Sequence, residues 1–268
     1  MLLQINSNRL APLIAHRPGK VIASIQSMVL TLTCLAASGA VSEDVETIER
    51  SASLRTLFPT DQLDALGSVI APDREIHWTL HVPAHSDGSG VIVFVSPDAS
   101  ATPPPAWIKV LDEHQLIWVA ARNFGNPVPV RQRILAAVMG LTYVQQHHRV
   151  DSSRVYIAGM SGGGRVASVA ITEFPQLFTG ALYIVGVNFW DEEASSRLEQ
   201  IRAKRYVFLT GDHDFNRGET RIVYKRYLEA GATHSLLMDL PHFGHQYPNA
   251  EQLEIAIQYL DADHTSVP

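Results

Sequence analysis

Cysteine is nearly absent from this chain, which has one, Cys34, among its 268 residues. This cysteine lies in an apolar stretch near the N-terminus, so a mature chain without that stretch would hold no disulfide. Acidic residues are missing as well before Glu43, and up to that point Arg9, Arg17 and Lys20 are the only charged side chains. These absences set the N-terminal segment apart from the rest of the chain.

The apolar stretch at residues 21–40 follows a basic residue and ends in small residues, an order typical of a secretory signal peptide. Interspersed Ser, Thr and Gln argue against a stable membrane-spanning helix. We expect an exported protein, periplasmic or secreted, in which residues 1–40 are a signal peptide or a disordered presequence and residues 41–268 form one domain. The alternatives are a cytoplasmic protein with an N-terminal tail, an uncleaved anchor, or a lipid attached at Cys34.

Several classes of ligand have no matching pattern in the sequence. No cluster of Lys and Arg interrupts a formal net charge of -6, with an isoelectric point near 6.0, so nucleic acid is an unsuitable partner. The chain lacks a G-x-G-x-x-G dinucleotide fingerprint. His77, His81 and His85 are four residues apart, but on an extended segment they would not converge on a metal. We therefore expect no cofactor and no metal, and the oligomeric state is left open.

From residue 75 onward, strand-like and helix-like segments alternate. Residues 91–95 and 116–121 are continuous apolar runs, as in strands buried on both faces, and residues 130–146 carry a helical apolar stripe. This alternation predicts an α/β fold with a mostly parallel sheet, helices on both faces and no sizeable lid. The expected strands are 75–82 (an edge strand), 91–95, 116–121, 156–158, 180–187, 206–210 and 235–240. The expected helices are 107–114, 130–146, one from 166, 197–202, 222–229 and 250–260.

A G-x-S-x-G motif at residues 159–163 joins a predicted strand to a predicted helix. In such a sharp turn the serine adopts strained dihedrals, and side chains two residues before and after it would collide with their surroundings, so glycine fits there. The turn places Ser161 at a helix N-terminus, where free N–H groups favour a developing negative charge. We interpret Ser161 as a nucleophile; the alternative is a glycine-rich turn without chemistry.

A serine nucleophile needs a base, and the base needs an orienting acid. Asp212 and Asp214 follow the strand predicted at 206–210, and His242 and His245 follow the strand predicted at 235–240. Ligands of such sheets bind beyond the carboxyl ends of the strands, where these residues would lie. The residues themselves leave open which member of each pair takes part.

The order Ser, Asp, His, together with the motif, resembles the α/β-hydrolase superfamily over roughly residues 75–260. The run R-V-D-S-S-R-V-Y-I-A-G-M-S-G-G at residues 149–163 looks closest to compact secreted esterases of the polyhydroxybutyrate-depolymerase and feruloyl-esterase type. The resemblance implies a serine esterase that works through an acyl-enzyme. It also implies that Ser161 is the nucleophile, that Asp214 is the acid, in a G-x-x-D pattern, and that His245, which a glycine precedes, is the base.

An oxyanion hole needs two donors aimed at the tetrahedral oxygen. One is expected to be the backbone N–H of Gly162. The second comes from the loop after the strand at 91–95, where the resemblance implies H-G-x and this chain departs from it with Ser96-Pro97-Asp98. Because Pro97 has no N–H, either Asp98 or Ala99 is expected to donate.

The expected substrate is a small-molecule or polymeric ester, which an open cleft would admit. Trp190, Phe124, Phe215, Phe243 and His242 fall on predicted strand-end loops and are candidates for contacting it. Most aromatic residues on such loops pack structurally, which is the alternative for each. At the level of function, the alternatives are an acyltransferase or a serine peptidase on the same scaffold, or a non-catalytic binding protein.

Overall fold

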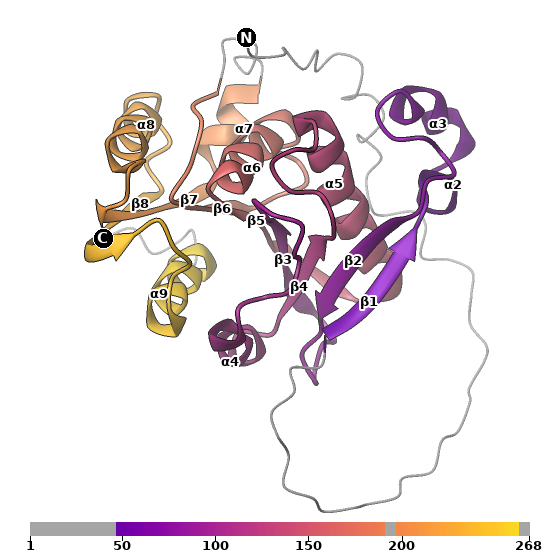
Figure 1. Cartoon of the computed structure of the whole chain (residues 1–268), viewed down its shortest axis with the longest axis horizontal. Helices are drawn as coiled ribbons and strands as arrows, with labels where there is room; N and C mark the ends of the chain where they lie inside the picture. The colour runs from indigo at the N-terminus through magenta and orange to yellow at the C-terminus, as the bar shows by residue number, and fades with distance from the viewer. Residues whose placement is uncertain (1–46, 191–196, 263–268) are drawn as a thin grey trace, which may run out of the picture.

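An eight-stranded sheet forms the centre of the protein, whose computed structural model describes residues 47–190 and 197–262 (Figure 1). The segment at residues 21–40, with Cys34, lies outside these ranges, so the signal peptide stays a prediction. None of the helices within them has the length and apolar character needed to cross a bilayer.

The strand order is β1-β2-β4-β3-β5-β6-β7-β8. β2 pairs antiparallel with both β1 and β4, and every later neighbour pair is parallel, which agrees with the predicted mostly parallel sheet. The strands are β1 (Thr47–Ala52), β2 (Ile76–His81), β3 (Ser89–Val95), β4 (Leu116–Ala121), β5 (Val150–Met160), β6 (Gly180–Ile184), β7 (Arg205–His213) and β8 (Ser235–Gly244).

Helices cover both faces of the sheet. α5, α6 and α8 pack on one face, with α2, α3 and α7 contributing to the same core, while α4 and α9 cover the opposite face (Figure 1). The helices are α2 (Leu54–Leu57), α3 (Thr60–Gly67), the 3-10 turn η2 (Pro105–Trp107), α4 (Ile108–Glu113), α5 (Val130–His147), α6 (Gly162–Glu173), α7 (Leu198–Arg202), α8 (Arg217–Glu229) and α9 (Ala250–Asp261).

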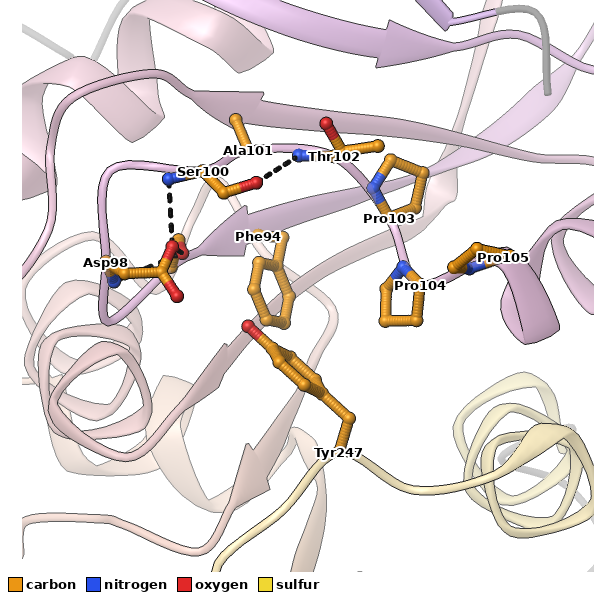
Figure 2. Close-up of a pocket in the computed structure, with 10 residues that line it drawn as sticks. Phe94, Asp98, Ser100, Ala101, Thr102, Pro103, Pro104, Pro105 and Tyr247 are labelled. Atoms are coloured by element: carbon orange, nitrogen blue, oxygen red, sulfur yellow. Dashed lines mark hydrogen bonds between the residues drawn. The ribbon is translucent and has the colours of Figure 1, made fainter. Parts of the chain in front are cut away.

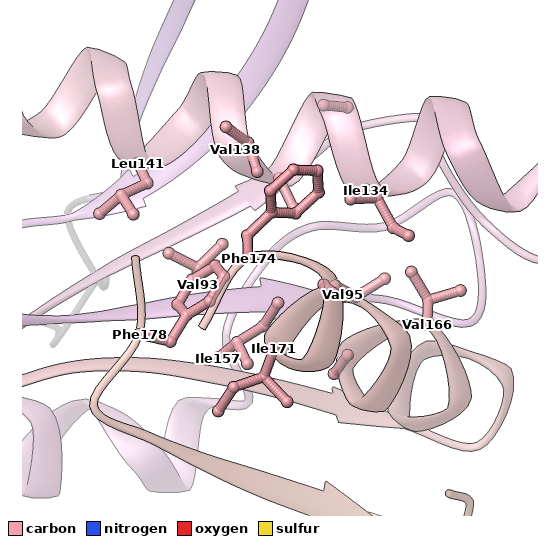
Figure 3. Close-up of a cluster of buried hydrophobic side chains, with 14 of the residues drawn as sticks. Val93, Val95, Ile134, Val138, Leu141, Ile157, Val166, Ile171, Phe174 and Phe178 are labelled. Atoms are coloured by element: carbon pink, nitrogen blue, oxygen red, sulfur yellow. The ribbon is translucent and has the colours of Figure 1, made fainter. Parts of the chain in front are cut away.

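The apolar runs of the sequence become the middle of the sheet. Every residue of β3 is buried, because helices cover both of its faces. Figure 3 shows part of the larger core, where the apolar stripe of α5 and the inner side of α6 meet the sheet. The residues labelled there are Val93, Val95, Ile134, Val138, Leu141, Ile157, Val166, Ile171, Phe174 and Phe178.

The expectation of an edge strand at residues 75–82 was wrong. β2 lies between β1 and β4, and all its residues except His77 are buried. The edge strand on this side of the sheet is β1, whose middle residues are exposed and polar, as suits a strand with one free side. Its sequence has too few apolar residues to reveal a strand by periodicity, which is why the sequence analysis missed it.

Two elements near the carboxyl edge of the sheet are longer than expected. β8 continues through Pro241 to Gly244, so His242 belongs to a strand. α8 begins at Arg217, five positions earlier than the sequence predicted, directly after the loop that carries Asp214. Both extensions shorten the loops that hold the predicted acid and base.

Candidate active site

Ser161 lies in a strained turn between β5 and α6. It has φ 53° and ψ -120°, a conformation that non-glycine residues rarely adopt, and it directly precedes α6. The flanking glycines leave no room for a side chain: a Cβ on Gly159 would lie 2.4 Å from the carbonyl carbon of Gly163, and one on Gly163 would lie 1.9 Å from the carbonyl oxygen of Val95. Close packing of strand against helix therefore requires both glycines of the motif.

The structure brings Ser161, His245 and Asp214 together from three different strand ends. Nε2 of His245 lies 2.9 Å from Oγ of Ser161, and Nδ1 of the same ring lies 2.9 Å from Oδ1 of Asp214. With Nδ1 donating to the carboxylate, Nε2 is left as the acceptor for the serine hydroxyl. The arrangement suits transfer of a proton from serine to histidine.

Asp214 is held by further hydrogen bonds. Its side chain is fully buried, Oδ2 accepts from Oγ1 of Thr210 at 2.7 Å, and Oδ1 accepts from the backbone N–H of Asn216 at 3.1 Å. The side chain of Asn216 in turn donates to the carbonyl oxygen of Val185 at 2.7 Å. These contacts fix the orientation of the carboxylate toward His245.

Phe215 lies against the ring of His245. Its ring stacks on the imidazole of His245, with centroids 4.1 Å apart and planes at 23°, although 78% of Phe215 is exposed. The phenyl ring therefore covers one face of the imidazole. Among the five candidate substrate contacts, Phe215 lies directly at the predicted base.

The loop after β3 faces the turn at Ser161. The carboxylate of Asp98 accepts from Oγ of Ser96 at 3.0 Å and from the N–H of Ser100 at 2.8 Å, so it is turned toward its own loop. The N–H of Asp98 lies 3.3 Å from Oγ of Ser96, a long contact. Gly162 is the first residue of α6, where an N–H has no acceptor within the helix.

Asn126, in the loop after β4, was missed by the sequence analysis. Its Oδ1 would lie 2.1 Å from a Cβ placed on Gly162, so the amide group sits directly over the first residue of α6. Nη1 of Arg133, which can only donate, is 3.3 Å from Oδ1. This contact identifies the oxygen and leaves the NH₂ group of Asn126 for another acceptor.

Arg133 is a buried cation surrounded by neutral oxygen atoms. It is 4% exposed, and it donates to the carbonyl oxygens of Ser96 (2.8 Å), Phe124 (3.0 Å) and Gly162 (3.4 Å). Burial lowers the pKa of Arg133 from its ordinary value to about 10, and the group stays charged at neutral pH. The charge on α5 therefore joins the loops after β3 and β4 to the turn at Ser161. The sequence analysis missed Arg133, which could have been identified as an arginine within the apolar stripe at residues 130–146.

A cavity of about 300 Å³ opens beside the loop after β3 (Figure 2). Phe94 and Tyr247, with ring centroids 6.1 Å apart, together line one side of it, and residues 103–105 form another side. Burial and the nearby carboxylate of Asp98 raise the pKa of Tyr247. The cavity shares Ser96 and Asp98 with the loop after β3, and Tyr247 follows the predicted base His245 by two positions in the chain. Sequence analysis had not singled out any of its aromatic residues.

The remaining candidate contacts lie elsewhere. Phe124 and Phe243 are 5% and 2% exposed and pack in the two hydrophobic cores, so neither side chain is open to a substrate. Trp190 is half-buried and stacks on Phe189, with ring centroids 4.3 Å apart, so it has a packing contact within the protein. His242 is exposed at φ 55°, beside His213.

Within residues 47–190 and 197–262, donor atoms suited to a metal come together beside the site, at the ends of β7 and β8. One atom from each of Asp212, His213 and His242 lies within 4.8 Å of the others. All three residues are exposed, and Asp212 does not contact His245 in the way that Asp214 does. The G-x-x-D interpretation thus selects the aspartate that lies at the imidazole.

Comparisons with known proteins agree with this architecture. Residues 136–238 match the model of the prolyl oligopeptidase family, which is a family of α/β-hydrolases. No curated protein matches the chain in sequence. Among solved structures, a thermophilic carboxylesterase cloned from a metagenomic library is similar at 13% identity and TM-score 0.60, over 83% of this chain and 92% of that one.

Two further esterase structures are similar. A ferulic acid esterase matches at 15% identity and TM-score 0.59, over 80% of this chain and 97% of that one. A thermostable esterase matches at 21% identity and TM-score 0.50, over 63% of this chain; the match spans about half (51%) of that protein's length. The family match and these neighbours support a hydrolase. Sheet order, family match and structural neighbours together identify the chain as a protein of the α/β-hydrolase fold.

Proposed function

We propose that this protein is a serine hydrolase that cleaves carboxylic esters. The observation that carries the proposal is the pair of 2.9 Å contacts that join Oγ of Ser161 to His245 and His245 to Asp214. A buried aspartate, a histidine whose Nε2 can accept the serine proton, and a serine at a helix N-terminus form the arrangement that nucleophilic acyl transfer requires.

The reaction proceeds in two halves. Nε2 of His245 takes the proton of Ser161 as Oγ attacks the ester carbonyl, and Asp214 orients the imidazole and stabilises its positive charge. The tetrahedral intermediate collapses, the alcohol leaves with the proton from His245, and the acyl group stays on Ser161. Water then attacks the acyl-enzyme with His245 as base, which releases the acid and restores the serine.

Donors for the oxyanion come from two sides of Ser161. The N–H of Gly162 is one, and the N–H of Asp98 is the second, because its contact with Oγ of Ser96 is long and can be exchanged. The amide of Asn126 packs against Gly162 with its oxygen nearest, and we propose that its NH₂ group turns to supply a third donor. The carboxylate of Asp98 points into its own loop, so it does not oppose the developing charge.

The cavity of about 300 Å³ beside Tyr247 suits an apolar group of the ester. Phe94 and residues 103–105 supply apolar surface, and the hydroxyl of Tyr247 is the polar group that an ester could contact. We infer that one part of the ester occupies this cavity while the rest remains at the open surface near Phe215. Simple acyl, phenolic and polymeric esters all meet this requirement.

A peptidase is the second candidate, because the family matched by residues 136–238 consists of prolyl oligopeptidases. The same serine chemistry would act on an amide, with His245 protonating the leaving amine. Comparing a chromogenic short-chain ester with a chromogenic prolyl amide separates the two. Faster turnover of the amide than of the ester would mean that the protein is a peptidase and not an esterase.

The test of the proposal uses Ser161→Ala, Asp214→Asn and His245→Ala. We expect the wild type to be labelled by a fluorophosphonate probe and to hydrolyse a p-nitrophenyl ester, and Ser161→Ala to lose both. His245→Ala and Asp214→Asn should reduce kcat by about 10³- to 10⁴-fold. Asp212→Asn, which changes the neighbouring aspartate, is the matched control. Full activity of Ser161→Ala, or no labelling of the wild type, would contradict the assignment.

A further inference from the structure

Asp212, His213 and His242 form a cluster of metal-binding side chains outside the Ser161 site. Asp212 and His213 are the last two residues of β7, and His242 lies near the end of β8. One donor atom of each lies within 4.8 Å of the other two, and Nε2 of His213 is 4.0 Å from Oδ1 of Asp212. The cluster therefore joins two neighbouring strands at the carboxyl edge of the sheet.

The backbone explains why these side chains meet. A Cβ on Gly211 would lie 2.5 Å from Cβ of Phe243, so glycine there allows the ends of β7 and β8 to approach closely. The pairing register shifts between Gly211 and His213, which ends the regular alternation that would place neighbouring side chains on opposite faces. His213 then pairs with Gly244, and its ring lies 5.8 Å from the ring of His242.

Arg217 and Arg221 make their hydrogen bonds to Asp239 and not to Asp212. Arg217 donates to both oxygens of Asp239 at 2.9 and 3.1 Å, and Arg221 donates to the same carboxylate at 2.8 Å, while the charge of Arg217 also interacts electrostatically with Asp212. The side chains of His213 and Asp212 are 66% and 36% exposed, so an ion can reach them from solvent. The cluster thus combines one negative charge with two imidazole groups at an open surface.

We propose that Asp212, His213 and His242 bind a divalent transition-metal ion, with zinc as the expected occupant. Two imidazole nitrogens and one carboxylate match the ligands of zinc, cobalt, nickel and copper, whereas magnesium and calcium require mainly oxygen ligands. Bonds of about 2.0–2.2 Å place tetrahedral donors about 3.4 Å apart. Rotation of these exposed side chains would shorten the distances between their donor atoms from as much as 4.8 Å to this value, and water would complete the coordination.

Binding at this place would connect the two segments that carry the predicted acid and base. Asp214 follows His213 by one residue, and His245 follows His242 by three. A bound ion would join the ends of β7 and β8 more firmly than their backbone pairing alone. The inference does not depend on esterase activity, since it concerns an ion site with its own ligands.

The experiment uses tag-free protein that has been treated with EDTA and dialysed. Zinc chloride is titrated in a calorimeter, and cobalt chloride is titrated while the visible d–d absorption is followed. We expect one ion per chain, a cobalt spectrum typical of nitrogen and oxygen ligands, and a rise of Tm with zinc, because the ion binds the folded state. His213→Ala, His242→Ala and Asp212→Asn should each weaken zinc binding by about tenfold or more.

Controls separate this site from other histidines. His85→Ala removes an exposed histidine outside the cluster and should leave zinc affinity unchanged. His245→Ala tests whether zinc binds at the imidazole beside Ser161 instead. Melting curves in EDTA show that each variant is folded, and His213→Gln provides a second variant if the alanine form is unstable. Zinc affinity that survives in all three cluster variants, or wild type that binds no zinc or cobalt, would overturn the proposal.

Discussion

The guanidinium of Arg133 donates a hydrogen bond to the carbonyl oxygen of Ser96 at 2.8 Å, and it is almost completely buried. Ser96 begins the loop that carries the proposed oxyanion donor Asp98, while the same guanidinium also reaches the carbonyl oxygen of Gly162. A side chain of α5 thus sets the distance between the two walls of the proposed oxyanion hole.

Arg133→Met keeps an unbranched apolar stem but removes the guanidinium and all its donors. The carbonyl oxygens of Ser96 and Phe124 would then be buried without partners, so the free energy of unfolding should fall by about 2–4 kcal/mol. Displacement of the loop after β3 should lower kcat by about a hundredfold, with a smaller change in KM. Urea unfolding and ester kinetics measure the two effects.

Lys109→Met removes an exposed cation of α4 and serves as the matched control, with little effect on either quantity. Arg133→Lys should retain part of the activity, because an ammonium group keeps the charge but cannot reach all the oxygens. Equal loss of kcat in the Lys and Met variants would show that the charge contributes nothing.

Asn126→Ala removes the amide group that lies over Gly162. If its NH₂ group donates to the oxyanion, kcat should fall by about a hundredfold while KM changes little, since the bond forms in the transition state. Asn126→Asp, which places a carboxylate there, should be at least as inactive. Stopped-flow acylation with a p-nitrophenyl ester measures the step. Gln258→Ala, an exposed amide in α9, is the control, and a normal acylation rate in Asn126→Ala would remove Asn126 from the mechanism.

Phe215→Ala exposes one face of the His245 imidazole. Aromatic contacts of this kind are worth about 0.5–1.5 kcal/mol, so a more mobile imidazole should lower kcat by roughly two- to tenfold. Because Phe215 is largely exposed, Tm should hardly change. Phe215→Tyr preserves the stacked ring and should restore the rate. A large loss of Tm in Phe215→Ala would instead indicate a role in folding.

Asp261→Asn tests how α9 is attached to the sheet at the end opposite to the site. Asp261 accepts from Arg154 at 2.9 and 2.6 Å and from the hydroxyl of Tyr156 at 2.6 Å. Replacing the carboxylate by an amide weakens these bonds and leaves a cation less well paired. The free energy of unfolding at pH 7 should fall by about 1–3 kcal/mol, as measured in urea.

The lowered pKa of Asp261 predicts that the stability of the protein depends on pH. Burial acts to raise the pKa of Asp261, but hydrogen bonds from Arg154 and Tyr156 outweigh it and hold the pKa below its ordinary value of 3.8. Since the pKa is lower in the folded state, this contribution is complete above the unfolded pKa and is lost as pH falls from about 4 downward. Asp261→Asn should show a smaller loss between pH 5 and 3, and an unchanged profile would argue against the contribution.

Much of the fold could be predicted from local patterns. The apolar run at 116–121 became β4 with the same bounds, and the stripe at 130–146 became α5 with one residue more. Such segments are buried on one or both faces, so hydrophobic periodicity reports them directly. β1 was missed because its polar residues carry no comparable signal, and its partner β2 was therefore placed at the edge.

Sequence alone determined the strained turn at Ser161, since a glycine two positions before and two after the serine has a steric reason that is local to the chain. It also limited the acid and the base to two short segments. Tertiary structure decided which atoms meet: it brought Asp214 to His245, turned the Asp98 carboxylate aside, and placed Asn126 over Gly162. It also placed His242 beside His213. Contacts of this kind depend on strand register and loop approach, and spacing along the chain does not encode them one by one.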